Sequence, residues 1–298
     1  MSNSTVGFIG LGRMGWPMAH NLATAGFPLV VHDVVADVAQ RFAAEHGAVA
    51  ATTAADFAST DVVVTMLPNG EIVQDSILRW TGGVASSLSA GSVIVEMSSS
   101  SPTDTVHLAE QVAEWGVRVV DAPVSGGVAR AVSGELSLMV GGDPQDITRV
   151  LPVLDVLGDP ARRFMSGPLG AGHAMKAMNN YVAAATYLAT AEALVIGQRY
   201  GLSSTAGIEV INASTGRSFV SEVVFEEVVS GRYSTGFLLG LLAKDVRIAR
   251  DLAAAADVDA PLSELVEHRW SEAVAALGGD RDHSEAHQAW WSAPLSAV

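Results

Sequence analysis

The chain has 298 residues, of which 49% are hydrophobic, enough for about two globular domains with sizeable cores. A net charge of −15 and a pI near 4.8 disfavour nucleic acids and anionic membranes as partners, because both require a basic surface. The absence of cysteine excludes disulfides, thiolate metal sites and a cysteine nucleophile.

The N-terminal segment Met1–Thr5 is short and polar and lacks the basic region of a signal peptide. The most apolar long stretch, Tyr181–Ile196, contains Thr186, Thr190 and Glu192 and is shorter than a bilayer-spanning helix. We therefore expect a cytoplasmic protein without a membrane partner.

Short β-branched runs alternate with helix-sized segments from residue 6 to about residue 164. Strands that are apolar on both faces and separated by helices are typical of a mostly parallel sheet covered by helices on each side. The pattern predicts an α/β fold, with a Rossmann-type doubly wound parallel sheet in residues 1–164. The expected strands are Val6–Ile9, Leu29–His32, Val62–Met66, Val93–Glu96, Val117–Asp121 and Leu136–Val140.

A glycine pattern, Gly10-x-Gly12-x-x-Gly15, directly follows the first expected strand and opens a helix. In this context Gly10 permits a tight turn, Gly12 lets the backbone approach a pyrophosphate, and Gly15 lets helix and sheet pack closely. The alternative is a glycine-rich turn with only a structural role.

The second expected strand is followed by Asp33, which lies 18 residues after Gly15. A carboxylate there can accept hydrogen bonds from the adenosine ribose hydroxyls and would repel a 2′-phosphate. We therefore predict a dinucleotide site that prefers NAD over NADP. The alternative for Asp33 is a helix N-cap, which Asp37 could supply instead.

After Phe164 the alternation stops. His173–Ile196 contains neither Pro nor Gly and would form a helix about 36 Å long. Because this helix is apolar nearly all round, we expect it to be buried. The sequence predicts an all-helical domain over residues 165–298, joined to the first by this long helix. Further helices are expected at about 204–214, 219–230, 237–256, 261–276 and 283–291.

Only two lysines, Lys176 and Lys244, occur beside fifteen arginines. An arginine cannot release its proton in a protein, whereas a partly buried lysine can be shifted to do so. The two lysines are therefore candidate proton carriers. The alternative is that both are solvated surface charges, the usual state of lysine.

Four separated blocks make the chain resemble the β-hydroxyacid dehydrogenase family, and within it the 3-hydroxyisobutyrate dehydrogenase-like enzymes. These blocks are Gly7–Gly15, Asp121–Gly127, Gly170–Asn180, and Phe237 with Lys244–Asp245. The resemblance covers essentially the full length of the chain.

The resemblance implies that Lys176 is catalytic and that Asn180 is its companion. Residues four apart lie on one helix face, so both can point at one bound oxygen. It also implies that Ser125, Gly126 and Gly127 hold the substrate carboxylate and that Lys244 reaches the nicotinamide end of the site. The implied cofactor contacts are Gly10, Leu11, Gly12, Arg13, Met14, Gly15, Asp33, Met66, Leu67, Pro68, Ser99 and Lys244.

Each implied role has a plainer alternative. The Ser125–Gly127 segment could be only a tight strand-to-helix turn, Asn180 an ordinary buried polar group with a backbone partner, and Lys244 a solvated helix charge. No metal is expected, because His283 and His287 are four residues apart without an HExxH frame.

The resemblance implies NAD-dependent oxidation of a short β-hydroxyacid by hydride transfer, with Lys176 as the proton carrier, in a homodimer or homotetramer. One alternative is an NAD(P)H-dependent reductase of a small aldehyde acid such as succinic semialdehyde or glyoxylate. Another is a non-catalytic dinucleotide sensor. Substrate specificity is expected to lie around Phe219, Phe237, Leu241 and the Trp290–Trp291 region.

Overall fold

The structure, a computed structural model, describes residues 4–292 and residue 295, so the first three residues of the expected polar segment lie outside it. The chain divides into two compact units, Met1–Lys176 and Ala177–Val298. The domain boundary expected between residues 164 and 165 stays a prediction. Within the described ranges, every helix falls short of the length or the apolarity that crossing a bilayer requires.

The first unit is built on a sheet with the strand order β3-β2-β1-β4-β5-β6-β8-β7, and β9 pairs with β8. The first six strands in this order are all parallel, the arrangement of a dinucleotide-binding doubly wound sheet. The predicted α/β fold class is therefore confirmed. The strands are β1 (Val6–Ile9), β2 (Leu29–His32), β3 (Val49–Ala50), β4 (Val62–Thr65), β5 (Val93–Glu96), β6 (Arg118–Asp121), β7 (Val124–Ser125), β8 (Leu136–Gly141) and β9 (Gly158–Gly167).

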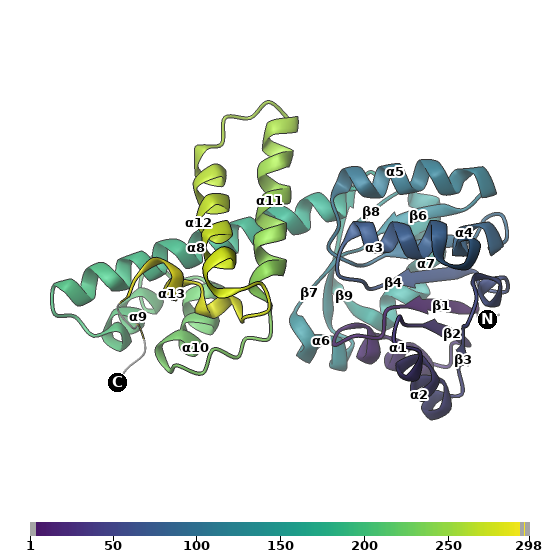
Figure 1. The fold of residues 1–298 in the computed structure, drawn as a ribbon, viewed down its shortest axis with the longest axis horizontal. Coiled ribbons are helices and arrows are strands. Elements are labelled where there is room, and N and C mark those ends of the chain that lie inside the picture. The colour runs from purple at the N-terminus through teal and green to yellow at the C-terminus, as the bar shows by residue number, and fades with distance from the viewer. Residues whose placement is uncertain (1–3, 293–294, 296–298) are drawn as a thin grey trace. The chain divides into compact units, whose positions relative to one another are not determined.

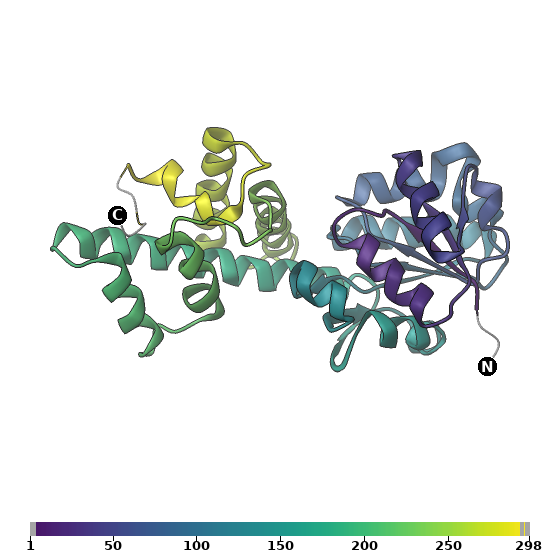
Figure 2. The same ribbon diagram turned by 90° about the horizontal axis from the view of Figure 1, so that it is seen from below.

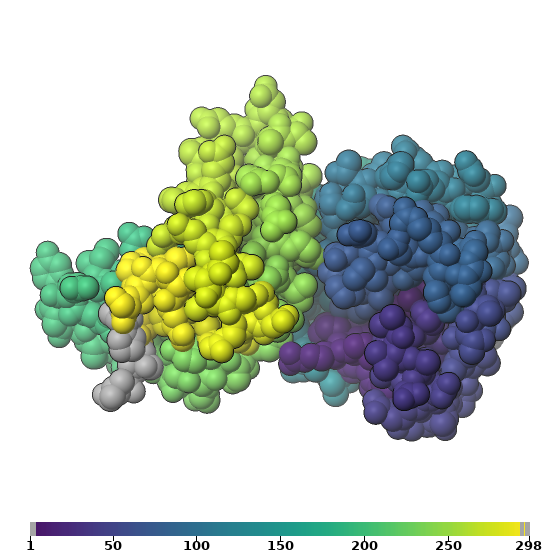
Figure 3. Space-filling model, viewed as in Figure 1, coloured from purple at the N-terminus to yellow at the C-terminus, as the bar shows by residue number. Residues whose placement is uncertain are grey.

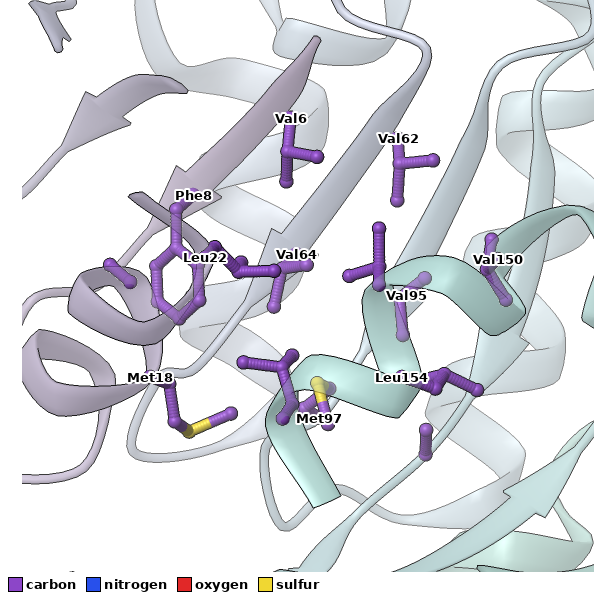
Figure 4. Close-up of a cluster of buried hydrophobic side chains, with 14 of the residues drawn as sticks. Val6, Phe8, Met18, Leu22, Val62, Val64, Val95, Met97, Val150 and Leu154 are labelled. Atoms are coloured by element: carbon purple, nitrogen blue, oxygen red, sulfur yellow. The ribbon is translucent and has the colours of Figure 1, made fainter. Parts of the chain in front are cut away.

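Helices cover both faces of this sheet, because successive strand side chains point to opposite sides. On one face Phe8 and Val64 pack against α1 (Gly15–Thr24), α2 (Ala36–His46), α6 (Gly127–Ser133) and α7 (Pro144–Leu157). Figure 4 shows this core, with Phe8 between the sheet and α1. On the other face Ile9 and Val63 pack against α3 (Gly70–Gln74), α4 (Val84–Ser87) and α5 (Pro102–Val112). These three helices are labelled in Figure 1.

Three strands were not expected from the sequence. Two of them, β3 and β7, are two residues long, too short to show an alternating pattern. The third, β9, continues to Gly167, past the point at which the strand pattern stops at Phe164. Most of its residues are exposed or only partly buried, so its sequence carries charged residues in place of an apolar run.

The second unit is helical, as predicted, apart from an isolated bridge between Leu238 and Asp282. Its core gathers around the buried side chains of Tyr187, Phe225 and Trp270. The helices are α8 (Ala171–Arg199), α9 (Ser204–Asn212), α10 (Phe225–Val229), α11 (Leu239–Ala255), α12 (Pro261–Leu277) and α13 (His287–Trp290). Helices α11 and α12 lie side by side and project from the rest of this unit (Figures 1 and 3).

The C-terminal tryptophan region contributes to packing within this unit. The indole of Trp290 lies edge-on to Trp270, with ring centroids 5.6 Å apart, and its Nε1 donates a hydrogen bond to the Arg269 carbonyl oxygen at 2.9 Å. Trp291 packs edge-on to Trp290, again with centroids 5.6 Å apart. Trp290 therefore helps to close the core around Trp270.

Helix α8 contains 29 residues and is slightly longer than the sequence predicts. It is continuous along its length (Figure 2). One face is buried through Ala184, Tyr187 and Ala191. Val182 and Ile196, in contrast, are 60% and 54% exposed. The expected burial of this helix therefore holds for one face in the single chain, because the second unit covers only that face.

Replacing Phe8 with Ala tests the core between β1 and α1. Because the ring is fully buried, its loss is expected to lower the free energy of unfolding of the first unit by about 3–5 kcal/mol. Differential scanning calorimetry of the full chain measures this effect. Val34→Ala is the control, since this side chain is 93% exposed and its loss should change stability by less than about 0.5 kcal/mol. Equal effects of both changes would contradict the packing described here.

Candidate active site

The parallel strands of the first unit end in one row. Ile9 pairs with Thr65, Thr65 with Glu96, and Glu96 with Asp121, each the last residue of its strand. His32, the last residue of β2, pairs with the other side of Ile9. We call this row the carboxyl edge. Ligands of doubly wound sheets bind in the crevice outside it.

The glycine turn leaves the carboxyl edge directly after β1. Gly10 has φ +98°, and a Cβ there would overlap the carbonyl oxygen of Met66. A Cβ on Gly15 would overlap the carbonyl oxygen of Gly10. These two glycines therefore allow the turn to pack against the neighbouring loop and α1 to start close to the sheet.

Gly12 differs from the other two glycines of the motif. It is exposed, and a Cβ there would have no protein atom within 4 Å. The protein's own packing thus gives no reason for glycine here, whereas a ligand lying against the backbone would. The unbonded N–H groups of a helix's first turn suit a pyrophosphate, so the turn and the start of α1 fit a dinucleotide.

Asp33 is tied to the glycine turn. Its Oδ2 accepts a hydrogen bond from the Leu11 N–H at 2.8 Å, and its Oδ1 accepts one from the Val35 N–H at 2.9 Å. The N-cap of α2 is Val35, with no side-chain cap, so neither Asp33 nor Asp37 caps this helix. Asp33 is only partly buried, and each carboxylate oxygen keeps a lone pair that can accept a ribose hydroxyl.

The next loop along the edge follows β4. Its Leu67 N–H donates to Ser98 Oγ at 2.9 Å, while the Met66 backbone lies against Gly10. Pro68 is exposed and Ser99 is partly buried. The structure therefore brings the predicted residues Met66, Leu67, Pro68 and Ser99 to the same edge as the glycine turn. Arg13 and Met14 lie within that turn, exposed and partly buried respectively.

The predicted carboxylate-binding residues follow β6. Ser125 ends β7, and Gly126 and Gly127 have φ values of +127° and +66°, which favour glycine. Both glycines are exposed, and a Cβ on Gly127 would have no protein atom within 4 Å. The aliphatic part of Arg130 lies over Gly126. The segment is a tight strand-to-helix turn whose backbone is open to solvent.

Lys176 lies in the second turn of α8 and is partly buried. The same helix carries Asn180, which is buried and whose Nδ2 donates to Asp245 Oδ2 at 2.6 Å. The other oxygen of Asp245 lies 3.4 Å from Lys244 Nζ, and the Lys244 side chain is only 21% exposed. Buried Asp245 thus links Asn180 to Lys244, so Lys244 is not a freely solvated charge and the partner of Asn180 is a side chain.

Two family models match the chain, one in each part. The NAD binding domain of 6-phosphogluconate dehydrogenase matches residues 5–167, more than half of the chain. The NAD-binding domain of NADP-dependent 3-hydroxyisobutyrate dehydrogenase matches residues 170–290.

Relatives extend this match over the full length. The 2-(hydroxymethyl)glutarate dehydrogenase of Eubacterium barkeri is 35% identical over 96% of this chain and 94% of its own. The chain belongs to the β-hydroxyacid dehydrogenase family. It is an oxidoreductase with NAD as its cofactor, as predicted.

Further members of the β-hydroxyacid dehydrogenase family agree. The NAD-dependent L-serine dehydrogenase of Pseudomonas aeruginosa is 36% identical over 87% of this chain and 89% of its own. The solved structure of Mycobacterium tuberculosis 3-hydroxyisobutyrate dehydrogenase with L-serine has a TM-score of 0.84 and 32% identity, and covers 96% of this chain and 99% of that one.

Sequence reasoning missed some polar residues of this dehydrogenase. Glu96 and His173 are fully buried together, and Asp245 bridges two predicted site residues. The sequence does carry a signal for Glu96, because an acidic residue ends an otherwise apolar strand. Asp33 has a similar position, directly after an apolar strand. Within residues 4–292 and 295, no group of three or more histidine and carboxylate side chains could hold a metal ion, and the expectation of no metal stays a prediction.

Alanine substitutions at Gly12 and Gly15 distinguish an effect on cofactor binding from an effect on folding. Gly12→Ala is expected to weaken NAD binding at least about tenfold with little change in stability, because only a ligand would meet the new methyl group. Gly15→Ala is expected to destabilise the first unit by more than about 1 kcal/mol, because its Cβ overlaps Gly10.

Calorimetry of the apo protein and titration with NADH, followed by protein fluorescence, measure the two effects. Unchanged NADH affinity in folded Gly12→Ala would show that the dinucleotide does not lie against this turn.

Proposed function

We propose that this protein oxidises the hydroxyl group of a short β-hydroxyacid with NAD, and that Lys176 carries the hydroxyl proton. The observation that supports this most is where α8 begins. Asp121, at the carboxyl edge, accepts a hydrogen bond from the Gly170 N–H, one residue before the helix. Lys176 is therefore carried by a helix that starts at the carboxyl edge. The glycine turn and the Ser125–Gly127 segment also follow strands that end at this edge.

The named relatives support the substrate class. 2-(Hydroxymethyl)glutarate, L-serine and 3-hydroxyisobutyrate share one unit, a CH₂OH group on the carbon that bears a carboxylate. The proposed substrate of this chain has that unit, HO–CH₂–CH(R)–COO⁻, with a small R group.

Separate residues of the chain would bind the substrate carboxylate and handle the hydroxyl proton. Backbone N–H groups of Ser125, Gly126 and Gly127 would hold the carboxylate, since glycines permit close approach and form an anion-binding concavity. Lys176 would accept the hydroxyl proton or stabilise the developing alkoxide, and Asn180 would hold the same oxygen. When bound, NAD supplies the acceptor for the hydride that leaves the hydroxyl-bearing carbon. Loss of the hydride and the proton leaves a carbonyl group.

Asp33 supports a preference for NAD over NADP. Its carboxylate is fixed against the glycine turn by Leu11 and Val35, and it would repel a 2′-phosphate. The residues that follow it on the turn, Val34 and Val35, offer no cation to neutralise that phosphate.

A homodimer or homotetramer remains part of the proposal. Val182, Ile196, Leu202 and Val210 on α8, α9 and the turn between them are each more than half exposed. Exposed apolar side chains of this kind favour association with another chain. A cytoplasmic location stays a prediction.

Initial rates of NADH formation at 340 nm test the proposal. The panel contains 3-hydroxyisobutyrate, 3-hydroxypropionate, L-serine, threonate and 4-hydroxybutyrate, each with NAD and separately with NADP. Turnover of a β-hydroxyacid that is faster with NAD is the expected result. NADH binding without turnover of any acid would contradict the proposed oxidation, and assays with succinic semialdehyde and glyoxylate would then test the reverse direction.

Lys176→Arg tests the proton role. Arginine keeps the positive charge but cannot release its proton, so kcat is expected to fall about 10²–10⁴-fold, the usual contribution of general acid–base catalysis. Initial rates on the best substrate of the panel measure the change, and NADH titration checks that the cofactor site is intact. Near-normal turnover by Lys176→Arg would exclude Lys176 as the proton carrier.

A further inference from the structure

A buried ionic cluster lies at the carboxyl edge of the first unit. Glu96 ends β5, Asp121 ends β6 and His173 lies in the first turn of α8, and each is at most 1% exposed. The His173 Nε2 lies 2.7 Å from Glu96 Oε2, and its Nδ1 lies 3.5 Å from Asp121 Oδ2. Two strands and one helix therefore meet at a single imidazole ring.

Asp121 holds the start of α8 from outside the helix. Its Oδ1 accepts a hydrogen bond from the Gly170 N–H and its Oδ2 accepts one from the His173 N–H, both at 2.8 Å. These are N–H groups that a helix start leaves without intrahelical partners. Gly172 permits the close approach, because a Cβ there would overlap the Met139 carbonyl oxygen and lie 2.8 Å from Asp121 Oδ2.

The His173 ring has an oxygen neighbour at each nitrogen. Besides Glu96, Nε2 has the Ser98 carbonyl oxygen at 3.2 Å, and Nδ1 has Thr105 Oγ1 at 2.9 Å. The Thr105 hydroxyl can in turn donate to the Ser101 carbonyl oxygen at 3.2 Å. An imidazolium, which donates from both nitrogens, satisfies this arrangement.

The charged forms of His173 and Glu96 stabilise each other. Burial by itself would lower the pKa of His173, but the carboxylates of Glu96 and Asp121 raise it above its usual 6.5. Burial would likewise raise the pKa of Glu96, but His173 and hydrogen bonds from Ser98 lower it to about 2. The stabilisation through Glu96 is present above pH 4.5 and is lost as the pH falls towards 2. The stabilisation through His173 is complete below pH 6.5 and is lost as the pH rises through the raised pKa of His173.

A cluster of this kind is a costly way to gain stability. Burying three charged groups carries a large desolvation penalty, and well-packed apolar residues often stabilise a protein equally well. What the cluster provides is direction, because both oxygens of Asp121 accept hydrogen bonds from backbone N–H groups at the start of α8. Glu96 Oε2 lies against the His173 ring, and Glu96 Oε1 is held by the Ser98 N–H. The cluster therefore fixes both the position and the rotation of the first turn of this helix.

We propose that Glu96, Asp121 and His173 are positioning residues for Lys176. Lys176 lies three residues after His173, about 4.5 Å further along α8, so the first turn cannot shift or rotate without moving it. The inference rests on the proposed function, because it assigns the cluster a role through the proton carrier. None of these three residues needs to touch the substrate.

Glu96→Gln and Asp121→Asn test the proposal, since both keep the side-chain shape and remove the charge. Both are expected to lower kcat about 10–100-fold on the best hydroxyacid of the panel, while KM for NAD stays within about twofold. Ser92→Ala is the matched control. This buried hydroxyl donates to the Thr60 carbonyl oxygen just before β5 begins, at the opposite end of the strand from Glu96.

A double-mutant cycle separates positioning from simple loss of structure. If the cluster acts through Lys176, Asp121→Asn in a Lys176→Arg background should lower kcat by less than about threefold further. Full additivity of the two losses would overturn the proposal. Near-normal turnover by Lys176→Arg alone would overturn the proposed function instead, so the two failures are distinguishable.

Hydrogen exchange gives a readout that does not depend on activity. The amides of residues 173–177 are expected to exchange at least about tenfold faster in Asp121→Asn than in the unaltered protein, and to be unchanged in Ser92→Ala. Unchanged exchange in Asp121→Asn would show that the carboxylate does not hold the start of α8, and would overturn the proposal.

Discussion

The hydrogen-bonded register of the parallel strands is the constraint on which the first unit depends. It places Ile9, Thr65, Glu96 and Asp121 side by side at one edge. From each of these residues the chain continues into a segment of the candidate site, so the register decides which segments can meet one ligand. A slip of one residue in any strand would turn its buried side chains to the other face and remove its segment from the edge.

Buried polar side chains lie at the carboxyl ends of the apolar strands. The strand interiors are apolar on both faces, but their last residues include Thr65, Glu96 and Asp121, all buried. Buried carboxylates are stable only when they are paired and hydrogen-bonded. Here the partners are His173, the Ser98 N–H and backbone N–H groups at the start of α8. The requirement to satisfy these carboxylates therefore couples the sheet to the helix that carries Lys176.

The sequence was most informative where a pattern is local. Runs such as Val93–Glu96 predict their strands to the residue, and the glycine motif after Ile9 predicts the turn. The motif also assigns different roles to Gly12 and Gly15, and the fold agrees, because a Cβ on Gly12 would meet no protein atom within 4 Å and one on Gly15 would overlap a carbonyl oxygen. The pairing of His173 with Glu96 spans 77 residues and depends on tertiary structure, as does the link from Asn180 through Asp245 to Lys244. The short strand β7 and the polar strand β9 lack a periodic signal altogether.

Chemical rescue of a Lys176 variant shows whether Lys176 transfers the hydroxyl proton. Lys176→Ala, assayed with the best hydroxyacid and saturating NAD, should be nearly inactive, and added primary amines should restore turnover. The rescued rate is expected to increase with the amine's basicity among amines of similar size, because a stronger base removes the proton faster in general-base catalysis. If Lys176→Ala binds NADH normally but no amine restores turnover, or if it is already active without amine, Lys176 is not the proton carrier.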